Sequence, residues 1–61
     1  MDMKQDDLLK KALLDTQERV RDYMNYSRYV EDEKLQRCFR NFAETEGKHA
    51  RKLQQFIDRL T

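Results

Sequence analysis

The chain carries two runs of mostly apolar residues whose spacing alternates between four and three, the repeat of an amphipathic helix. The first run consists of Leu9, Leu13, Thr16, Val20, Tyr23, Ser27 and Val30. The second consists of Leu35, Phe39, Phe42, Glu46, His49, Leu53, Phe56 and Leu60. Each run predicts one helix with an inward-facing stripe, the first over about residues 5–29 and the second over about residues 34–60.

The segment between the two runs, residues 30–33, is short and acidic. Asp32 is suited to cap the second helix, because a carboxylate accepts hydrogen bonds from the free N–H groups of a helix start. The candidate caps of the first helix are Asp2, Asp6 and Asp7. A connection this short makes consecutive helices antiparallel neighbours. We therefore predict an all-α antiparallel two-helix hairpin that forms a single domain over residues 1–61.

The composition agrees with an all-helical fold that needs a partner. Of the 61 residues 41% are charged, there is no proline and only one glycine, Gly47, and good helix formers dominate. A chain this short rarely builds an adequate core alone. We expect a homodimer in which two hairpins form a four-helix bundle, most simply with two-fold symmetry. Gly47 either allows close approach of another backbone or is merely tolerated inside its helix.

Charge and hydropathy exclude several function classes. The net charge is +1 and acids alternate with bases, so no basic face indicates binding to nucleic acid or to an anionic membrane. No apolar stretch approaches the roughly 20 residues of a membrane span, and residues 1–11 do not read as a signal peptide. Cys38 is the single cysteine and is interpreted as a small buried hydrophobe. We expect a cytoplasmic protein.

Glu46 and His49 interrupt the second run, three residues apart on one helix face. A buried carboxylate or imidazole is costly unless it is paired, hydrogen-bonded or bound to metal. A fold point near residue 31 places Thr16 opposite Glu46, since both helices rise about 1.5 Å per residue. A two-fold axis would also bring two copies of Glu46 and His49 together. Arg19, on the first helix, is interpreted as part of a solvated face.

The Glu-x-x-His spacing on an inward helix face is the spacing that di-iron and di-manganese carboxylate proteins use. A carboxylate with an imidazole suits iron, manganese or zinc. The segment Phe42-Ala43-Glu44-Thr45-Glu46-Gly47-Lys48-His49-Ala50-Arg51-Lys52-Leu53 resembles the second-helix motif of the ferritin-like superfamily, in particular its rubrerythrin-type and encapsulated half-ferritin members. The likeness covers roughly residues 13–57.

The resemblance implies a two-helix protomer whose dimer completes a ferritin-like four-helix bundle and its di-metal centre. In that centre Glu46 would be the bridging carboxylate, His49 the terminal imidazole and Tyr23 the nearby phenol. The chain departs from the family at Thr16, where the family supplies a glutamate seven residues before the tyrosine. A symmetric dimer would therefore offer four ligands rather than six.

Three arrangements of those four ligands stay open from the sequence. They could hold one tetrahedral metal, which would suit zinc, or a weaker di-metal pair completed by water. They could also hold no metal, and each Glu46 would then hydrogen-bond His49 in a polar layer that fixes register.

We accordingly expect a small ferritin-like or rubrerythrin-like protein that handles iron or reduces oxygen or peroxide if its metal site is active. The alternative is a non-catalytic structural or protein-interaction module with a buried Glu/His layer. A third reading is an adaptor hairpin that docks on a larger helical protein through the same apolar stripe.

Overall fold

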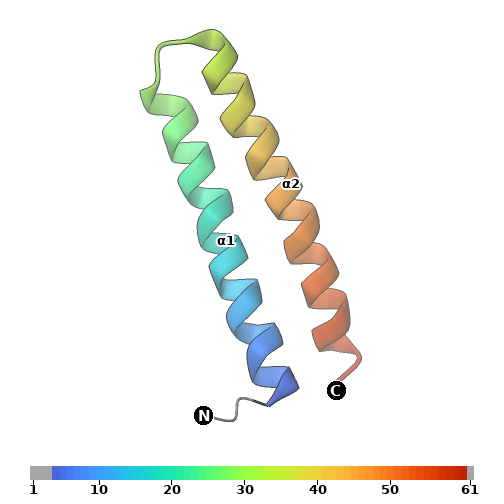
Figure 1. The fold of residues 1–61 in the computed structure, drawn as a ribbon. Helices are drawn as coiled ribbons and strands as arrows, with labels where there is room; N and C mark the ends of the chain where they lie inside the picture. The colour runs from blue at the N-terminus through green and yellow to red at the C-terminus, as the bar shows by residue number, and fades with distance from the viewer. Residues whose placement is uncertain (1–3, 61) are drawn as a thin grey trace.

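The structure is a computed structural model that describes residues 4–60, and it is an antiparallel hairpin of two long helices (Figure 1). Helix α1 spans Gln5–Tyr29 and helix α2 spans Glu33–Asp58. The helices lie side by side, with the turn at one end and both chain ends at the other. The predicted all-α hairpin is confirmed, and α2 begins one residue and ends two residues earlier than expected.

The start of α2 is capped as predicted, whereas the start of α1 is not. The Asp32 carboxylate accepts a hydrogen bond of 3.0 Å from the backbone N–H of Leu35. The residue before α1 is Lys4, whose side chain makes no capping hydrogen bond. Asp6 and Asp7 lie inside the first turn of α1 instead, so the prediction that either caps this helix is wrong. They still favour it, because negative charge is stabilising at a helix N-terminus. Asp2 lies outside the described residues.

The side of α1 that faces α2 is the predicted stripe, and every member of the first run is buried or half-buried. Its two hydroxyl residues, Thr16 and Ser27, are buried and donate hydrogen bonds to their own helix. Thr16 Oγ1 lies 2.7 Å from the carbonyl oxygen of Ala12, and Ser27 Oγ lies 2.6 Å from that of Met24. Small side chains with satisfied hydroxyls let the two helices approach without leaving a buried polar atom unpaired.

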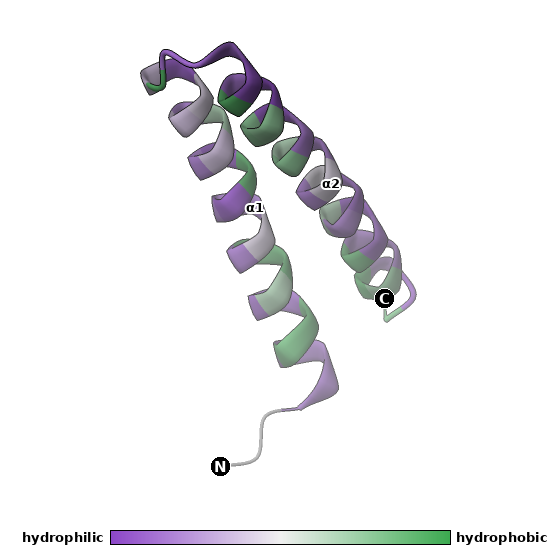
Figure 2. Ribbon diagram, turned by 45° about the horizontal axis from the view of Figure 1, so that its top comes forward, coloured by the Kyte–Doolittle hydropathy of each residue, from purple (hydrophilic) through white to green (hydrophobic). Residues whose placement is uncertain are grey.

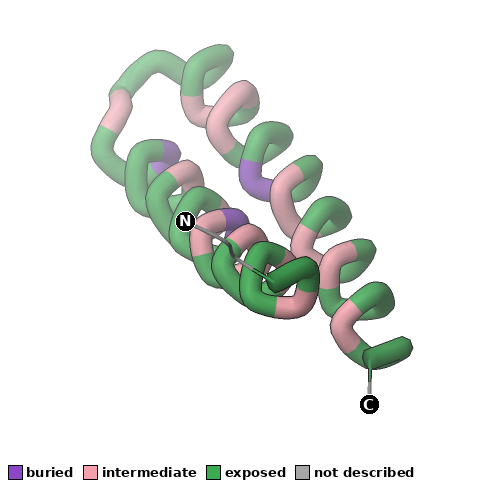
Figure 3. Tube along the Cα trace, turned by 60° about the horizontal axis from the view of Figure 1, so that its bottom comes forward, coloured by how far each residue is buried: buried purple, intermediate pink, exposed green. Residues whose placement is uncertain are grey.

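The side of α2 that faces α1 differs from the prediction by a rotation of the helix (Figure 3). The positions on the predicted stripe that stay exposed are Leu35, Phe42, His49, Phe56 and Leu60. The buried and half-buried positions of α2 are Gln36, Cys38, Phe39, Ala43, Glu46, Gly47, Ala50, Leu53 and Ile57. At 3.6 residues per turn the apolar and half-buried positions together span roughly 180° of α2. One neighbouring helix covers only part of such an arc, so the remaining part stays open.

The hairpin is elongated and has an interface rather than a closed core. It measures 43 × 24 × 11 Å, and its radius of gyration of 14.2 Å exceeds the roughly 10.5 Å of a compact chain of this length. Within residues 4–60 Ala43 is the one buried hydrophobic residue, and no large side chain is fully buried. Figure 2 shows hydrophobic residues recurring turn after turn along both helices, and several large ones, among them Leu14 and Phe42, are exposed.

Aromatic side chains gather between the helices in the half nearer the turn. The Tyr23 ring lies 5.4 Å from the Phe42 ring and 6.1 Å from the Phe39 ring, measured between centroids. The Tyr26 ring lies 5.5 Å from that of Phe39. Of the three tyrosines Tyr23 alone is half-buried, as predicted, while Tyr26 and Tyr29 are exposed. The aromatic cluster, defined as Tyr23, Tyr26, Phe39 and Phe42, makes this half of the hairpin the bulkier one.

Replacing Gly47 with alanine is expected to stabilise the protein. A Cβ atom at this position would find the Arg51 side chain as its nearest neighbour, at 4.0 Å, which is ordinary van der Waals contact. Glycine inside a helix is less stable than alanine by about 0.5–1 kcal/mol. Urea denaturation should show a gain of that size for Gly47→Ala. A loss of stability would instead show that a second backbone approaches Gly47 closely.

Candidate functional site

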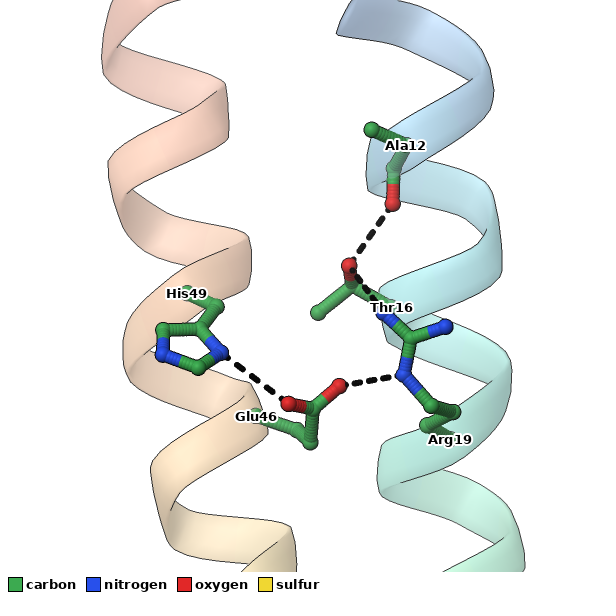
Figure 4. Close-up of polar contacts among 5 residues, drawn as sticks. All are labelled: Ala12, Thr16, Arg19, Glu46 and His49. Atoms are coloured by element: carbon green, nitrogen blue, oxygen red, sulfur yellow. Dashed lines mark hydrogen bonds and ion pairs between the residues drawn. The ribbon is translucent and has the colours of Figure 1, made fainter.

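The carboxylate of Glu46, at the middle of α2, is held from two sides (Figure 4). Its Oε2 atom accepts a hydrogen bond of 2.5 Å from Arg19 Nε on α1. Its Oε1 atom lies 3.0 Å from Nδ1 of His49, one turn further along α2. The Arg19 guanidinium also donates to Thr16 Oγ1 at 3.1 Å through Nη2. We call these four residues, Thr16, Arg19, Glu46 and His49, the polar layer.

The members of the polar layer differ in how far they are exposed. The side chain of Glu46 is 15% exposed, that of Arg19 50% and that of His49 61%. Glu46 therefore points between the helices, as predicted. His49 lies on the open flank of α2 within the single hairpin, because the rotation of α2 carries it away from α1.

Thr16 is linked to Glu46 only through Arg19, and it lies level with His49 rather than opposite Glu46 (Figure 4), so the predicted pairing of Thr16 with Glu46 is wrong by about one turn. The interpretation of Arg19 as part of a solvated face is wrong, because its guanidinium bridges the two helices. The sequence held a usable signal, since Arg19 follows Thr16 by three residues and so projects from a neighbouring part of the same face. A long cationic side chain there can reach a carboxylate on the adjacent helix.

The ion pair sets the protonation state of Glu46. The hydrogen bond from Arg19 lowers the pKa of the Glu46 carboxyl, partial burial opposes that shift, and the contact with His49 adds to it. The same hydrogen bond raises the pKa of the Arg19 guanidinium. Glu46 is therefore ionised at neutral pH and needs the cation beside it.

The contribution of Glu46 to stability is expected to disappear in acid. A carboxyl whose pKa is lower in the folded than in the unfolded state stabilises the fold above the unfolded value and loses that contribution as pH falls through the folded value. Wild type should therefore be more stable than Glu46→Gln above the ordinary pKa of 4.5, and the difference should shrink below it. Urea titrations of both proteins across this range measure the difference. Glu44→Gln, at an exposed position, is the control. An advantage that grows towards low pH would contradict this account.

A shallow groove lies beside the polar layer. It is lined by Tyr23, Phe42, Thr45 and Glu46 and encloses about 330 Å³. The structure thus brings Tyr23 next to Glu46, on the same open side of the hairpin as His49. The groove combines two aromatic rings with a carboxylate whose two oxygens already have partners.

One chain does not supply a fitting site for a resident metal ion. Within residues 4–60 no group of three or more His, Cys, Asp or Glu side chains lies close enough to share an ion. Glu46 and His49 converge, but a guanidinium already holds one carboxylate oxygen and would repel a cation. The Thr16 hydroxyl, where a third ligand would be needed, is hydrogen-bonded to its own helix. A metal would require ligands from a second chain and displacement of Arg19.

The structure also bears on the predictions made for Cys38 and for membrane-spanning segments. Cys38 is half-buried and is a free cysteine. Neither helix of the described part of the chain contains a stretch long and apolar enough to cross a lipid bilayer.

Comparison with known protein families, with curated proteins and with solved structures gives no match for this chain. The ferritin-like resemblance therefore stays a prediction from the motif around Glu46 and His49.

Proposed function

We propose that this hairpin is a non-catalytic self-association module, in which two copies pack into a four-helix bundle and the polar layer fixes their register. The observation that carries the proposal is the size of the surface. The chain exposes 5235 Å², whereas a compact monomer of its 7.5 kDa mass would expose about 4,200 Å². An excess of roughly 1,000 Å² means that this hairpin leaves uncovered much of what a folded protein buries.

Several of the exposed apolar side chains lie on one side, which we call the open face, whereas Leu14, at 62% exposed, lies about 140° around α1 from Arg19. Helix α2 contributes Leu35, Phe42 and Phe56, which are 41%, 46% and 41% exposed. These three and His49 are seven residues apart or a multiple of seven, and residues with that spacing on a helix project to the same side.

Helix α1 extends the open face around Arg19, which reaches towards Glu46 and so marks the side of α1 concerned. Tyr26 and Ala12 lie seven residues on either side of Arg19 and share its side of the helix. Leu8, one turn before Ala12, is exposed as well. The open face is therefore made of Leu8, Ala12, Arg19 and Tyr26 from α1, Leu35, Phe42, His49 and Phe56 from α2, and the groove between the helices.

A second copy has the right size to cover this face. A compact dimer of about 15 kDa would expose roughly 7,000 Å², so two hairpins would bury on the order of 3,000 Å² in total. That area falls among permanent interfaces, which bury about 2,000–5,000 Å².

The polar layer suits a role in register rather than in catalysis. Burying a charge is tolerable only when it is paired and hydrogen-bonded, and the Arg19–Glu46 pair meets both conditions inside each protomer. A shift of one protomer along the other would place such a pair against leucine or phenylalanine. Among its neighbours no nucleophile has both a base and an orienting acid positioned with it.

The test is oligomeric state by native mass spectrometry, combined with the triple variant Arg19→Leu/Glu46→Leu/His49→Leu, which removes both partners of the ion pair. The parent should be a dimer. The triple variant should stay a dimer with a higher melting temperature, because replacing a whole buried ion pair by apolar residues of similar size is often neutral or stabilising. A folded monomer at micromolar concentration would contradict the proposal and favour an adaptor that docks on a different protein.

A metal centre across the dimer is the second candidate, favoured by the 3.0 Å approach of Glu46 Oε1 and His49 Nδ1. Two such pairs would offer four ligands to zinc, iron or manganese. Cobalt or zinc titration of the untagged parent, Glu46→Ala and His49→Ala tests it. If both variants bind as much metal as the parent, this candidate is lost, and with it the iron, oxygen or peroxide chemistry that the resemblance implies.

A further inference from the structure

We infer that the two hairpins of the dimer stack with their turns at opposite ends, related by a two-fold axis that crosses the helices at the height of His49. The inference rests on the proposed self-association and specifies its partner surface. In this arrangement α2 faces the partner's α2 and α1 faces the partner's α1. The alternative, with both turns at one end, places α1 against the partner's α2.

The first argument is the spacing of the exposed residues on α2. Phe42 and Phe56 lie seven residues on either side of His49. An axis through His49 therefore places Phe42 against the partner's Phe56, and does so twice. Both phenylalanines are more than 40% exposed in the hairpin, and each would cover the other. The order of Phe42, His49 and Phe56 is the same in both directions from His49, so this stripe of α2 can pack against an antiparallel copy of itself.

The second argument is that α1 has its centre of symmetry at the same height. Ala12 and Arg19 lie on the open face, and the point midway between them falls at residues 15–16. Arg19 contacts Glu46, so these two residues lie at the same height in the hairpin. Because the helices are antiparallel and rise equally per residue, three residues back along α1 and three residues forward along α2 reach the same height. Residue 16 is therefore level with residue 49. One axis serves both helices and places Arg19 against the partner's Ala12, a long side chain against a short one.

The two halves of the hairpin differ in side-chain volume. The aromatic cluster of Tyr23, Tyr26, Phe39 and Phe42 fills the half of the hairpin near the turn. The other half carries one aromatic ring, that of Phe56. Its other apolar residues are smaller and lie between the helices or on the open face: Leu8, Leu9, Ala12, Leu13, Leu53 and Ile57. Stacking turn on turn would crowd two aromatic clusters at one end and leave the other end thin. Opposite stacking sets the aromatic half of each hairpin against the half with smaller residues of its partner and keeps the distance between the helices even, at about 8–10 Å.

The arrangement also separates like charges. Arg19 lies about 3.5 residues from the axis, so it and the partner's Arg19 are about 10 Å apart along the bundle. The two Glu46 carboxylates are separated by a similar distance, and each keeps its own guanidinium. Neither polar layer therefore has to accommodate the partner's Arg19 beside its own.

Distances between spin labels distinguish the two arrangements. In a Cys38→Ser background, which removes the single native thiol, a cysteine label is placed at the turn as Glu31→Cys or near the open end as Lys4→Cys. Opposite stacking about this axis predicts separations of about 50 Å for Glu31→Cys and about 35 Å for Lys4→Cys, each in its own dimer, at about 1.5 Å per residue. It predicts a short separation in mixed dimers that carry one label of each kind. Turns at the same end would give separations under about 20 Å within each single-label dimer, because bundle helices lie about 8–10 Å apart.

A disulfide test gives a second, independent reading. His49→Cys in the same Cys38→Ser background should oxidise rapidly to a covalent dimer, since disulfide formation needs Cβ atoms about 3.5–4.5 Å apart and the axis passes through this position. Glu44→Cys, on the outer side of α2, is the matched control and should remain monomeric on a denaturing gel.

The outcomes separate the two proposals. Labelled protein that sediments as a folded monomer overturns the self-association itself. A dimer with short separations in the single-label samples, or with Glu44→Cys cross-linking as fast as His49→Cys, overturns opposite stacking and leaves self-association standing. Long separations, short mixed separations and selective His49→Cys cross-linking support the arrangement.

Discussion

Phe42→Asp is expected to dissociate the dimer and to leave most of the chain unfolded at micromolar concentration. Phe42 packs against Tyr23 inside the hairpin and is 46% exposed on the open face, so it belongs both to the contact between the helices and to the proposed dimer interface. Truncating a large aromatic residue in a core costs about 3–5 kcal/mol, and an unpaired carboxylate there adds a further penalty. A protein of this size has little more stability than that to lose.

Circular dichroism and sedimentation velocity measure this outcome together. The matched control is Tyr29→Asp, because Tyr29 is aromatic, lies on the same hairpin and is 84% exposed. It should keep the helicity and the dimer of the parent. A Phe42→Asp protein that remains a stable dimer would show that the open face is not the interface.

Ala43→Leu is expected to be the second largest perturbation. Ala43 is 4% exposed and lies where α2 approaches α1 closely. Added methyl and methylene groups in a filled interface cost about 1–3 kcal/mol through strain and shifts of the backbone. Urea denaturation should show a loss of that size.

The control for Ala43→Leu is Glu44→Leu, which adds the same side chain at the neighbouring exposed position. It should change the free energy of unfolding by no more than about 0.5 kcal/mol. Equal effects of the two variants would mean that α1 and α2 are not in close contact at Ala43.

The polar layer meets the electrostatic need of Glu46 within one chain. A carboxylate between helices needs a positive partner, and in this hairpin the Arg19 guanidinium is that partner. An ion pair and a metal ion satisfy the same electrostatic requirement, but the ion pair leaves no open coordination position. The hydroxyl of Thr16 fits this view, because it accepts a hydrogen bond from Arg19.

Much of the fold could be predicted from the sequence. The alternating spacing of four and three predicted the two helices. The first run, from Leu9 to Val30, is buried or half-buried in every member, because all its large residues face a single neighbour. Asp32 was recognisable as a cap from its place before the second run.

The errors have physical causes. The predicted stripe placed His49 between the helices, but its side chain is 61% exposed, because the side of α2 nearest α1 is centred on Ala43 and Ala50 instead. The role of Arg19 depends on the distance between two helices rather than on spacing within one. A pattern along the chain does not record which cation is nearest across an interface. Glu46 could be predicted to need a partner, but not which one.

Thermal unfolding at several protein concentrations tests self-association most directly. A dimer that folds on association has a melting temperature that depends on concentration. Over a hundredfold dilution series followed by circular dichroism, we predict a rise of about 5 °C for each tenfold increase in concentration, from the unfolding enthalpy expected for a dimer of this size. A cooperative transition at one fixed temperature throughout the series would show that the single hairpin is stable alone and would contradict the account.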